Sequence, residues 1–576
     1  MPRSHVRSDS MIRLACVAVA ALLSVACSPQ DDTTAPPAQP ETRVDAKPAP
    51  VQPTSEGAFQ AAITAEDFAA RLQKLSSDQF EGRQPGTIGE RMSTAYIKDQ
   101  FERIGLKPGN KGSWFQTVPM MKVTLLDPAQ VALEVNGSKS QLKLGIGTDS
   151  VIGSLKGSPE VTLKDSPIVF VGYGVNAPDW NDYADLDVAG KTVIALINDP
   201  GWGSQDPNLF KGPALTYYGR WTYKFEEAAR RGAAALFIVH ETGGAGYPWS
   251  VVQNGWTGPQ FSLPGSEDPA PRLDAAGWLS EDAATRLFAS AGADFASLKK
   301  SADIAGFKPV ALDAKLSVTF RSGIESASSE NVIGMLPGSE RPDEAVFYTA
   351  HWDHLGKDDS LTGDQIYNGA IDNATGVAAM MEIAEALRQQ PTRRSVVFAA
   401  VTLEESGLLG SRYLVGHLPF AADKVAADIN IDILALSGPS RSVTSIGYGQ
   451  SEMDDYLIAA AKEQSRTVVP DDKPEKGFFF RSDHINFARA GIPALYASSG
   501  MDLVDGGEAA GRKAADDYTA NRYHKPADDY DPAWDFRGAV QDMDLLLAIG
   551  KRLADESTYP QWKAGADFSR PATTEP

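Results

Sequence analysis

The chain has 576 residues, of which 42% are hydrophobic and 22% charged, a composition typical of a globular protein. This length exceeds what one hydrophobic core usually supports, so we expect two or more domains. The formal net charge is −21, from 54 basic and 75 acidic residues. Such a balance argues against nucleic acid as a partner and against broad contact with anionic lipid.

Residues 1–27 have the pattern of an export signal. Three arginines precede an uncharged stretch at 14–26, which is too short to span a bilayer as a stable helix. Small residues then precede Cys27, an arrangement similar to a bacterial lipoprotein processing site. We therefore expect export to the periplasmic face of the cell envelope, with a lipid on Cys27 as the only membrane contact. A secreted or soluble periplasmic form is the alternative, and the start at Met1 or Met11 stays open.

The rest of the chain divides into segments of different character. Residues 28–57 are rich in Pro, Ala, Thr and Gln without an apolar period, which predicts a disordered linker. Helical periodicity dominates the start of 58–149, whereas 150–323 alternates short β-like runs with Gly- and Pro-rich loops and predicts an inserted β-rich or α/β module. Strand, loop and helix then alternate through 324–556, which predicts a mostly parallel, mixed central sheet with helices on both faces. We expect the tail at 557–576 to fray.

Hydrophobic periodicity places the individual elements. In chain order, we expect helices at about 62–75 and 89–104, strands at 167–171 and 192–197, a helix at 224–231 before a strand at 233–239, a strand at 345–350, a helix at 375–387, and strands at 395–402 and 426–434. The only cysteines, Cys16 and Cys27, precede these elements, so removal of the signal leaves no internal disulfide.

Acids and histidines stand at the ends of the hydrophobic runs in the second half of the chain. The set is His351, Asp353, Asp372, Glu404, Glu405, Asp432 and His524. Open α/β sheets form their sites outside the carboxyl ends of the strands. Charges gathered there are costly unless something binds them, and a divalent metal is the simplest compensation.

The chemistry of this set suits two zinc ions, because it offers two imidazoles, carboxylates that finish or bridge the metals, and one spare base. His351 would bind zinc through one nitrogen, and Asp353 would hydrogen-bond the other. The side chains of Glu404 and Glu405 diverge, so we interpret Glu405 as a ligand and Glu404 as the general base. Each signal alone has an ordinary explanation. His351 with Asp353 could be a salt-bridged histidine, the adjacent glutamates could lie in a solvated surface turn, and Asp372 could form an Asx turn before a helix. By chemistry alone, His354 and His484 are equally good ligands.

Taken together, these segments resemble the zinc-dependent exopeptidases of peptidase family 28, of the bacterial aminopeptidase type. The matching segments are 331–338, 349–356, 369–376, 403–411, 482–487, 491–494 and 523–528. The resemblance implies a phosphorylase/hydrolase-like di-zinc exopeptidase fold for 58–149 and 324–556. It also implies a protease-associated domain for 150–323, carried by 170–175, 187–193 and 224–233, which would roof part of the cleft.

Carried over by position, the family pattern implies two zinc ions per chain. The residues implied are His351, Asp372 and Asp432 for one zinc, Asp372, Glu405 and His524 for the other, Glu404 as general base and Asp353 as orienting residue. The family usually has a cis peptide after the bridging aspartate, here Asp372–Asn373. His354 and His484 become bystanders or supporting groups.

The function implied is that of an exported zinc aminopeptidase that hydrolyses N-terminal residues from peptides, with a metal-bridging water and Glu404 as base. Alternatives are a carboxypeptidase acting on acidic dipeptides, a glutaminyl cyclase with one zinc, and a non-catalytic binding protein of the transferrin-receptor type. Arg481, Phe480 and Tyr523 are the candidate substrate-binding residues. Side-chain preference, physiological substrate and oligomeric state stay open.

Overall fold

The computed structural model describes residues 51–55 and 58–570. The expected signal segment, Cys27 and most of the expected linker lie outside the described residues. Within 51–55, Val51 packs against the main hydrophobic core, and the Thr54 N–H donates to the Glu66 carbonyl at 3.1 Å. This end of the expected linker is therefore held by the folded chain. Among the described residues, no helix has the length and apolarity needed to cross a membrane.

The sheet of the main module, which we define as residues 58–130 and 324–570, is mixed and parallel at its centre, as predicted. Its central strands are β17 (Arg394–Val401), β14 (Arg341–His351), β18 (Val425–Asn430) and β21 (Ala494–Ser499), in that order and all parallel. The antiparallel neighbours are β13 (Val310–Leu336) beside β17 and β19 (Ser442–Ile446) beside β21, and β20 (Thr467–Pro470) follows β19. The parallel strand ends therefore meet along one edge of the sheet.

Helices cover both faces of this sheet, which confirms the predicted layering. One core contains residues of α1 (Ala65–Leu75), α2 (Ile88–Ile104), α9 (Thr375–Arg388), α11 (Met453–Glu463) and α14 (Arg537–Asp555). The opposite core contains residues of α10 (Leu409–Gly416) and α12 (His484–Arg489). Helix α13 (Gly507–Asn521) is mostly exposed.

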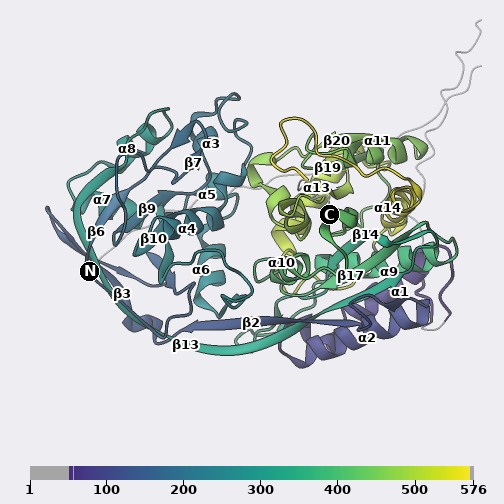
Figure 1. Ribbon diagram of the computed structural model, residues 1–576. Coiled ribbons are helices and arrows are strands. Elements are labelled where there is room, and N and C mark those ends of the chain that lie inside the picture. Colours follow the sequence, from purple (N-terminus) through teal and green to yellow (C-terminus); the bar gives the residue numbers. More distant parts are fainter. Residues whose placement is uncertain (1–50, 56–57, 571–576) are drawn as a thin grey trace, which may run out of the picture. The chain divides into compact units, whose positions relative to one another are not determined.

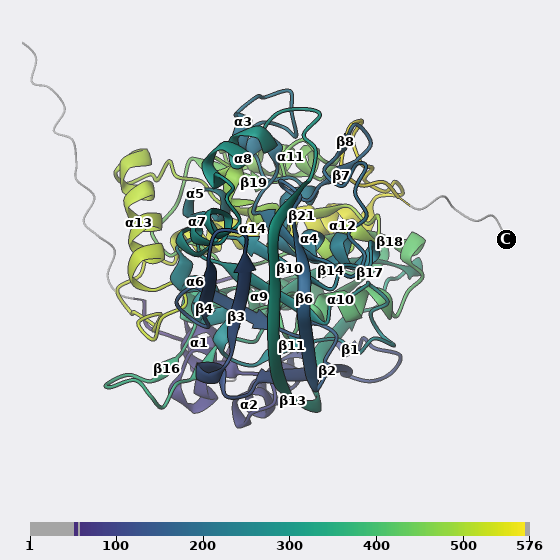
Figure 2. The same ribbon diagram turned by 90° about the vertical axis from the view of Figure 1, so that its left-hand side faces the viewer.

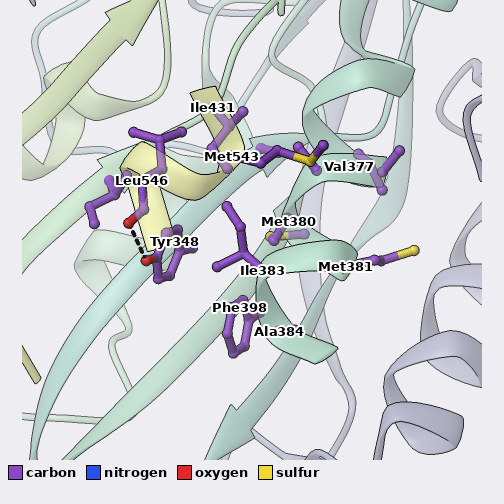
Figure 3. Packing of buried hydrophobic residues seen from close by; sticks show 14 of the residues in the cluster. Tyr348, Val377, Met380, Met381, Ile383, Ala384, Phe398, Ile431, Met543 and Leu546 are labelled. Atoms are coloured by element: carbon purple, nitrogen blue, oxygen red, sulfur yellow. Dashed lines mark hydrogen bonds between the residues drawn. The ribbon is translucent and has the colours of Figure 1, made fainter. Parts of the chain in front are cut away.

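Successive side chains of the central strands point to opposite faces of the sheet, and both faces are buried. The sequences of these strands are therefore continuous apolar runs. On β14, Val346 and Tyr348 face the first core and Ala345 and Phe347 face the second, so both faces are buried. Figure 3 shows Tyr348 among side chains from α9 and α14; its hydroxyl donates to the Leu546 carbonyl at 2.8 Å. The strand that carries His351 is thus fixed by packing on both sides.

The inserted module, which we define as residues 131–323, is an α/β unit with its own sheet and cores. The strands, in sheet order, are β4 (Gln141–Gly145), β3 (Ala132–Gly137), β13, β6 (Glu160–Phe170), β9 (Thr192–Leu196), β10 (Ala235–Val239), β12 (Ala275–Leu279) and β5 (Ser150–Gly153). Figure 2 shows β3, β13 and β6 side by side. The helices are α3 (Pro200–Ser204), α4 (Trp221–Arg230), α5 (Thr242–Ala245), α6 (Trp249–Thr257), α7 (Glu281–Ser290) and α8 (Phe295–Ala302).

The upstream boundary of this module lies before the expected residue 150. The module begins upstream because the β3–β4 hairpin pairs into its sheet and places Leu133 and Val135 in its core. The downstream boundary falls inside β13, which belongs to both sheets. Residues 322–332 of β13 pair with β2 (Phe115–Leu125), and the two strands run side by side as the connection between the modules (Figure 1).

Short strands complete the described fold. They are β1 (Lys107–Pro108), β7 (Asn176–Ala177), β8 (Trp180–Asn181), β11 (Gln260–Ser262), β15 (Gly356–Lys357) and β16 (Ile366–Tyr367).

The tail does not fray over its described part, 557–570, contrary to expectation. The Trp562 indole N–H donates to the Gly491 carbonyl at 2.9 Å, and the Arg570 guanidinium donates to the Val425 carbonyl at 3.1 Å. Asp567 forms a 2.9 Å ion pair with Lys211 of the inserted module. These specific polar contacts hold a segment whose composition alone predicts disorder.

Candidate metal centre

The sheet edge and the loops around it bring the predicted acids and histidines together. His351 is the last residue of β14, Glu404 and Glu405 follow β17, and Asp432 follows β18. The predicted strand at 426–434 ends early, at Asn430, because Ile433 has a φ of +62° and the chain turns there. Asp432 therefore lies in the turn at the edge of the sheet and is not part of the strand.

Asp372 lies in a distorted turn, Ala370–Ala374, directly before α9. Its peptide bond to Asn373 is cis, as expected. The Asp528 carboxylate accepts the N–H groups of Ile371 and Asp372 at 3.1 Å and so orients this turn. Because α9 carries the apolar face that packs on β14, the turn is anchored to the core from one side and to Asp528 from the other.

Distances within the cluster match the spacing of ligand atoms around one ion. His351 Nε2 lies 3.3 Å from Asp372 Oδ1 and 3.4 Å from Asp432 Oδ1. His524 Nε2 lies 3.3 Å from Asp372 Oδ2 and 3.1 Å from Glu405 Oε2. Ligands at the usual zinc–nitrogen and zinc–oxygen lengths in tetrahedral geometry are about 3.3 Å apart. Each oxygen of Asp372 therefore faces a different histidine, at a spacing that suits a metal.

Burial supports the same fit. His351, Asp372 and Asp432 are all buried. Asp432 Oδ1 has no hydrogen-bond donor among the described residues. A buried carboxylate oxygen without a donor is costly, and a bound cation would remove that cost.

His354 is also close to the cluster, but its distance to the nearest acid is different. Its Nδ1 lies 2.6 Å from Glu405 Oε1, which is a hydrogen-bond length and shorter than the spacing of two ligands. This hydrogen bond fixes Glu405 Oε1, and the other oxygen, Oε2, faces His524. His484 packs between the rings of Phe479 and Tyr496, and burial lowers its pKa to about 3.

The neighbouring glutamates have opposite electrostatic environments. Burial, with Glu405 and Asp432 nearby, raises the pKa of Glu404 well above its usual value despite the attraction of His351. Burial also disfavours the charge of Glu405, but His524 and His354 outweigh it and lower its pKa to about 2. Glu405 is therefore suited to remain an anion, and Glu404 is suited to take up a proton.

The histidines are influenced by the same acids. Burial disfavours the charge of His351, but Glu404, Asp372 and Asp432 outweigh it and raise its pKa well above the usual value. His351 and His524 in turn outweigh the effect of burial on Asp372 and lower its pKa well below the usual value.

Asp353 contacts a different partner from the one expected. Its carboxylate Oδ1 is 3.8 Å from His351 Nδ1, beyond hydrogen-bond range, and the histidine nitrogen is instead 3.1 Å from the Asp353 backbone carbonyl. The carboxylate accepts the Glu404 backbone N–H at 3.1 Å. Asp353 thus orients His351 through the main chain and Glu404 through the side chain.

Arg83 is a central residue that the sequence reasoning missed. Its buried guanidinium donates to five backbone carbonyls, those of Leu75, Trp352, Asn368, Gly369 and Asp372, at 2.6–3.4 Å. Burial lowers its pKa to about 10, against the attraction of Asp372, Asp528 and Asp353. The residue ties the end of β14 to the Asp372 turn. No local pattern marks it, because four of its five carbonyl partners lie at least 269 residues away in the sequence.

A cavity of about 270 Å³ opens beside the cluster and reaches Glu404 and Glu405. All three predicted substrate-binding residues, Phe480, Arg481 and Tyr523, line it. The Tyr523 ring also stacks on His524 with centroids 4.0 Å apart.

Comparison with known proteins places this site in context. Residues 331–548 match the model of Peptidase family M28. A probable zinc metalloprotease from Leptosphaeria maculans is 29% identical over 167 residues, which are 26% of this chain and 38% of the relative. Aminopeptidase YwaD from Bacillus subtilis is 29% identical over 171 residues, 29% of this chain and 34% of the relative. The matched parts thus span well under half the length of these curated relatives.

A solved structure, an aminopeptidase from Aneurinibacillus sp. strain AM-1, aligns with 88% of this chain and 96% of its own, with a TM-score of 0.48 and 18% identity.

Proposed function

We propose that this chain is a zinc metallopeptidase that removes N-terminal residues from peptides with two metal ions, and the match of residues 331–548 to the model of Peptidase family M28 supports this proposal. The observation that carries the proposal is the position of Asp372, whose two oxygens each lie 3.3 Å from a different histidine. One carboxylate between two sets of donors is the arrangement that a two-metal hydrolase needs. The printed names of zinc metalloprotease and aminopeptidase relatives support the class of reaction.

The spacing of the donor atoms supports the following proposed ligands for the two ions. His351, Asp372 and Asp432 would hold one, and Asp372, Glu405 and His524 would hold the other. When bound, such a pair polarises the scissile carbonyl and makes a nearby water more acidic.

Glu404 is the proposed proton carrier. It lines the cavity and is 11% exposed, with Oε2 4.0 Å from His351 Nε2. It would accept the proton of the attacking water and return it to the departing amine. The hydrogen bond from its backbone N–H to the Asp353 carboxylate fixes the position of the Glu404 main chain, from which the side chain extends.

The two acids at the metal end of the cavity favour a positively charged N-terminal group of the substrate. A peptide ammonium placed at this end of the cavity would meet Glu404 and Glu405, and the Tyr523 ring, stacked on His524, lines the same space. These two acids support the proposal of cleavage next to a free amine, and not within a chain.

The decisive experiment replaces Glu404→Gln and measures metal content together with hydrolysis of leucine p-nitroanilide. We expect about two zinc ions per chain to remain while kcat falls by roughly 10²–10⁴-fold, the usual contribution of a general base. Glu463→Gln, at an exposed position of α11, is the matched control and should behave as wild type. Near-normal turnover in the Glu404 variant would refute its role, and a content near one ion would favour a single-metal enzyme.

Two parts of the proposal rest on sequence alone. We propose that the inserted module is a protease-associated domain, and that the protein is exported and anchored through Cys27. Cys27→Ser in the producing cell should move the protein from the membrane fraction to the soluble fraction. An unchanged distribution would refute the lipid anchor.

A further inference from the structure

The cavity beside the metal centre is formed by both modules. The inserted module contributes Ile197, Leu215, Gly219, Arg220, Trp221, Thr222, Gly244, Ala245 and Tyr247, and the main module contributes Glu404, Glu405, Gly407, Leu408, Lys476, Gly477, Phe480, Arg481 and Tyr523. The two modules touch directly here, because the Leu215 N–H donates to the Pro474 carbonyl at 3.1 Å. A substrate held at the candidate metal centre would therefore extend into a space that residues of both modules line.

Three cations line this space: Arg220, Lys476 and Arg481. Within the described part of the chain, none of them forms an ion pair with a carboxylate. The only acids in the lining are Glu404 and Glu405, which the proposed function already uses for proton transfer and metal binding. The nearby Arg412 is different, since it pairs with Asp268 at 2.6 Å.

Aromatic rings hold the two guanidinium groups in place. Arg220 lies over Tyr217 and Phe480, with its Cζ 5.5 and 5.9 Å from the ring centroids. Arg481 lies over Phe478 and Tyr247, at 5.5 and 5.8 Å. Stacking of this kind orients the planar group and leaves its N–H donors free for another acceptor.

The charge of Arg220 persists in this setting. Burial, reinforced by Arg489, lowers its pKa to about 10, which still leaves it protonated at neutral pH. A partly desolvated cation without a partner is costly, and an anionic ligand would offset that cost.

We propose that this cavity binds a carboxylate of the substrate, so that preferred peptides carry an acidic side chain or a free C-terminus close to the scissile bond. The proposal rests on the proposed peptidase function and deepens it by naming a substrate class. Arg220 and Arg481 would hydrogen-bond the carboxylate through paired N–H donors, and Lys476 would add a third positive charge. A neutral isostere would leave those donors unpaired, which is the situation in which polar sites discriminate strongly.

The test measures kcat/KM of the zinc-loaded, full-length protein on peptide pairs that differ only in one carboxylate. The pairs are Glu- and Gln-p-nitroanilide, Leu-Glu-amide and Leu-Gln-amide, and Leu-Leu and Leu-Leu-amide. At least one pair should favour the carboxylate by about tenfold or more, the usual effect of a hydrogen bond to a charged group. The favoured pair identifies the source of the carboxylate as the first side chain, the second side chain or the C-terminus.

Variants link any preference to the cavity. Arg220→Met and Arg481→Met should each reduce the carboxylate-to-neutral ratio several-fold, and Arg481→Lys should retain part of it. Arg91→Met, at an exposed position of α2, is the matched control and should leave the ratio unchanged.

Ratios near one for all three wild-type pairs, with neutral members hydrolysed, would overturn this inference and leave the proposed function standing. Hydrolysis of no member would overturn both. A preference that survives both methionine substitutions would place carboxylate recognition elsewhere and refute the cavity assignment. The wild-type comparison decides the question even if a variant fails to fold.

Discussion

The two halves of the acid–histidine cluster share Asp372 but are built differently. In the buried half, His351 is 1% exposed and stands at the end of β14, with Asp432 just after β18. In the open half, His524 is 35% exposed, has a φ of +55° and lies in a loop after α13. A donor at the end of a buried strand is held by the whole sheet, whereas a loop donor is held by a few local contacts. We infer that an ion in the open half would exchange more easily.

The supporting contacts follow the same division. Arg83 serves the bridge and the buried half, because it bonds the carbonyls of Trp352 and Asp372. His354 supports the open half directly, through its 2.6 Å contact with Glu405. Substitutions at these positions can therefore separate the halves experimentally.

The largest effect should come from Asp372→Asn, which affects both halves at once. We expect zinc content to fall for both ions and kcat/KM to drop by more than about 100-fold, since even the partners of metal ligands are worth 10–100-fold. Elemental analysis and peptidase assays measure the two effects. Asp423→Asn, at an exposed position, is the control. Loss of only one ion would show that Asp372 is not shared.

Arg83→Met should come next, because it leaves buried carbonyls without a donor. Each unsatisfied buried acceptor costs on the order of 1–3 kcal/mol, so we expect the metal-free variant to lose roughly 3 kcal/mol or more of unfolding free energy. Denaturant titration of stripped protein measures it, and Arg91→Met on α2 is the control. A stability equal to wild type would contradict the role of Arg83 in joining the β14 end to the Asp372 turn.

The smallest and most selective effect should come from His354→Asn. We expect the affinity for one zinc ion to fall by about 10–100-fold while the other is kept, because only Glu405 loses its partner. Calorimetric titration of the stripped protein with zinc resolves the two events. His417→Asn, at a partly exposed histidine stacked on Tyr413, is the control. Equal weakening of both ions would show that the halves are not separately supported.

Local pattern was sufficient where packing follows the chain. Continuous apolar runs predicted β14 and β17, and a helical period predicted α9, since burial on both faces or on one face leaves that signature. Polar residues directly after these runs had to lie at the same edge of the sheet. The gathering of His351, Asp372, Glu405 and Asp432 could therefore be expected without coordinates.

Contacts between distant segments could not be predicted in this way. The carbonyls of Trp352 and Asp372 are 269 and 289 residues from Arg83. The prediction placed Asp353 correctly beside His351 but gave the contact to the wrong group of Asp353. His351 Nδ1 lies 3.1 Å from the Asp353 backbone carbonyl and 3.8 Å from its carboxylate, and sequence patterns cannot resolve a difference of less than 1 Å. The upstream end of the inserted module lies before residue 150 because the β3–β4 hairpin pairs with β13, a strand distant in the sequence.

The sequence by itself determined the chemistry available: which acids and histidines stand at the strand ends, and the parallel sheet that aligns them. Only the tertiary structure decided which oxygen faces which histidine, which half is open to solvent, and that Arg220 of the inserted module meets Lys476 and Arg481 of the main module beside the site. The physical reason is the distance along the chain between the groups that interact. Strand formation depends on neighbours along the chain, whereas ligand spacing, desolvation and the unpaired charges of Arg220 and Arg481 depend on groups that folding alone brings together.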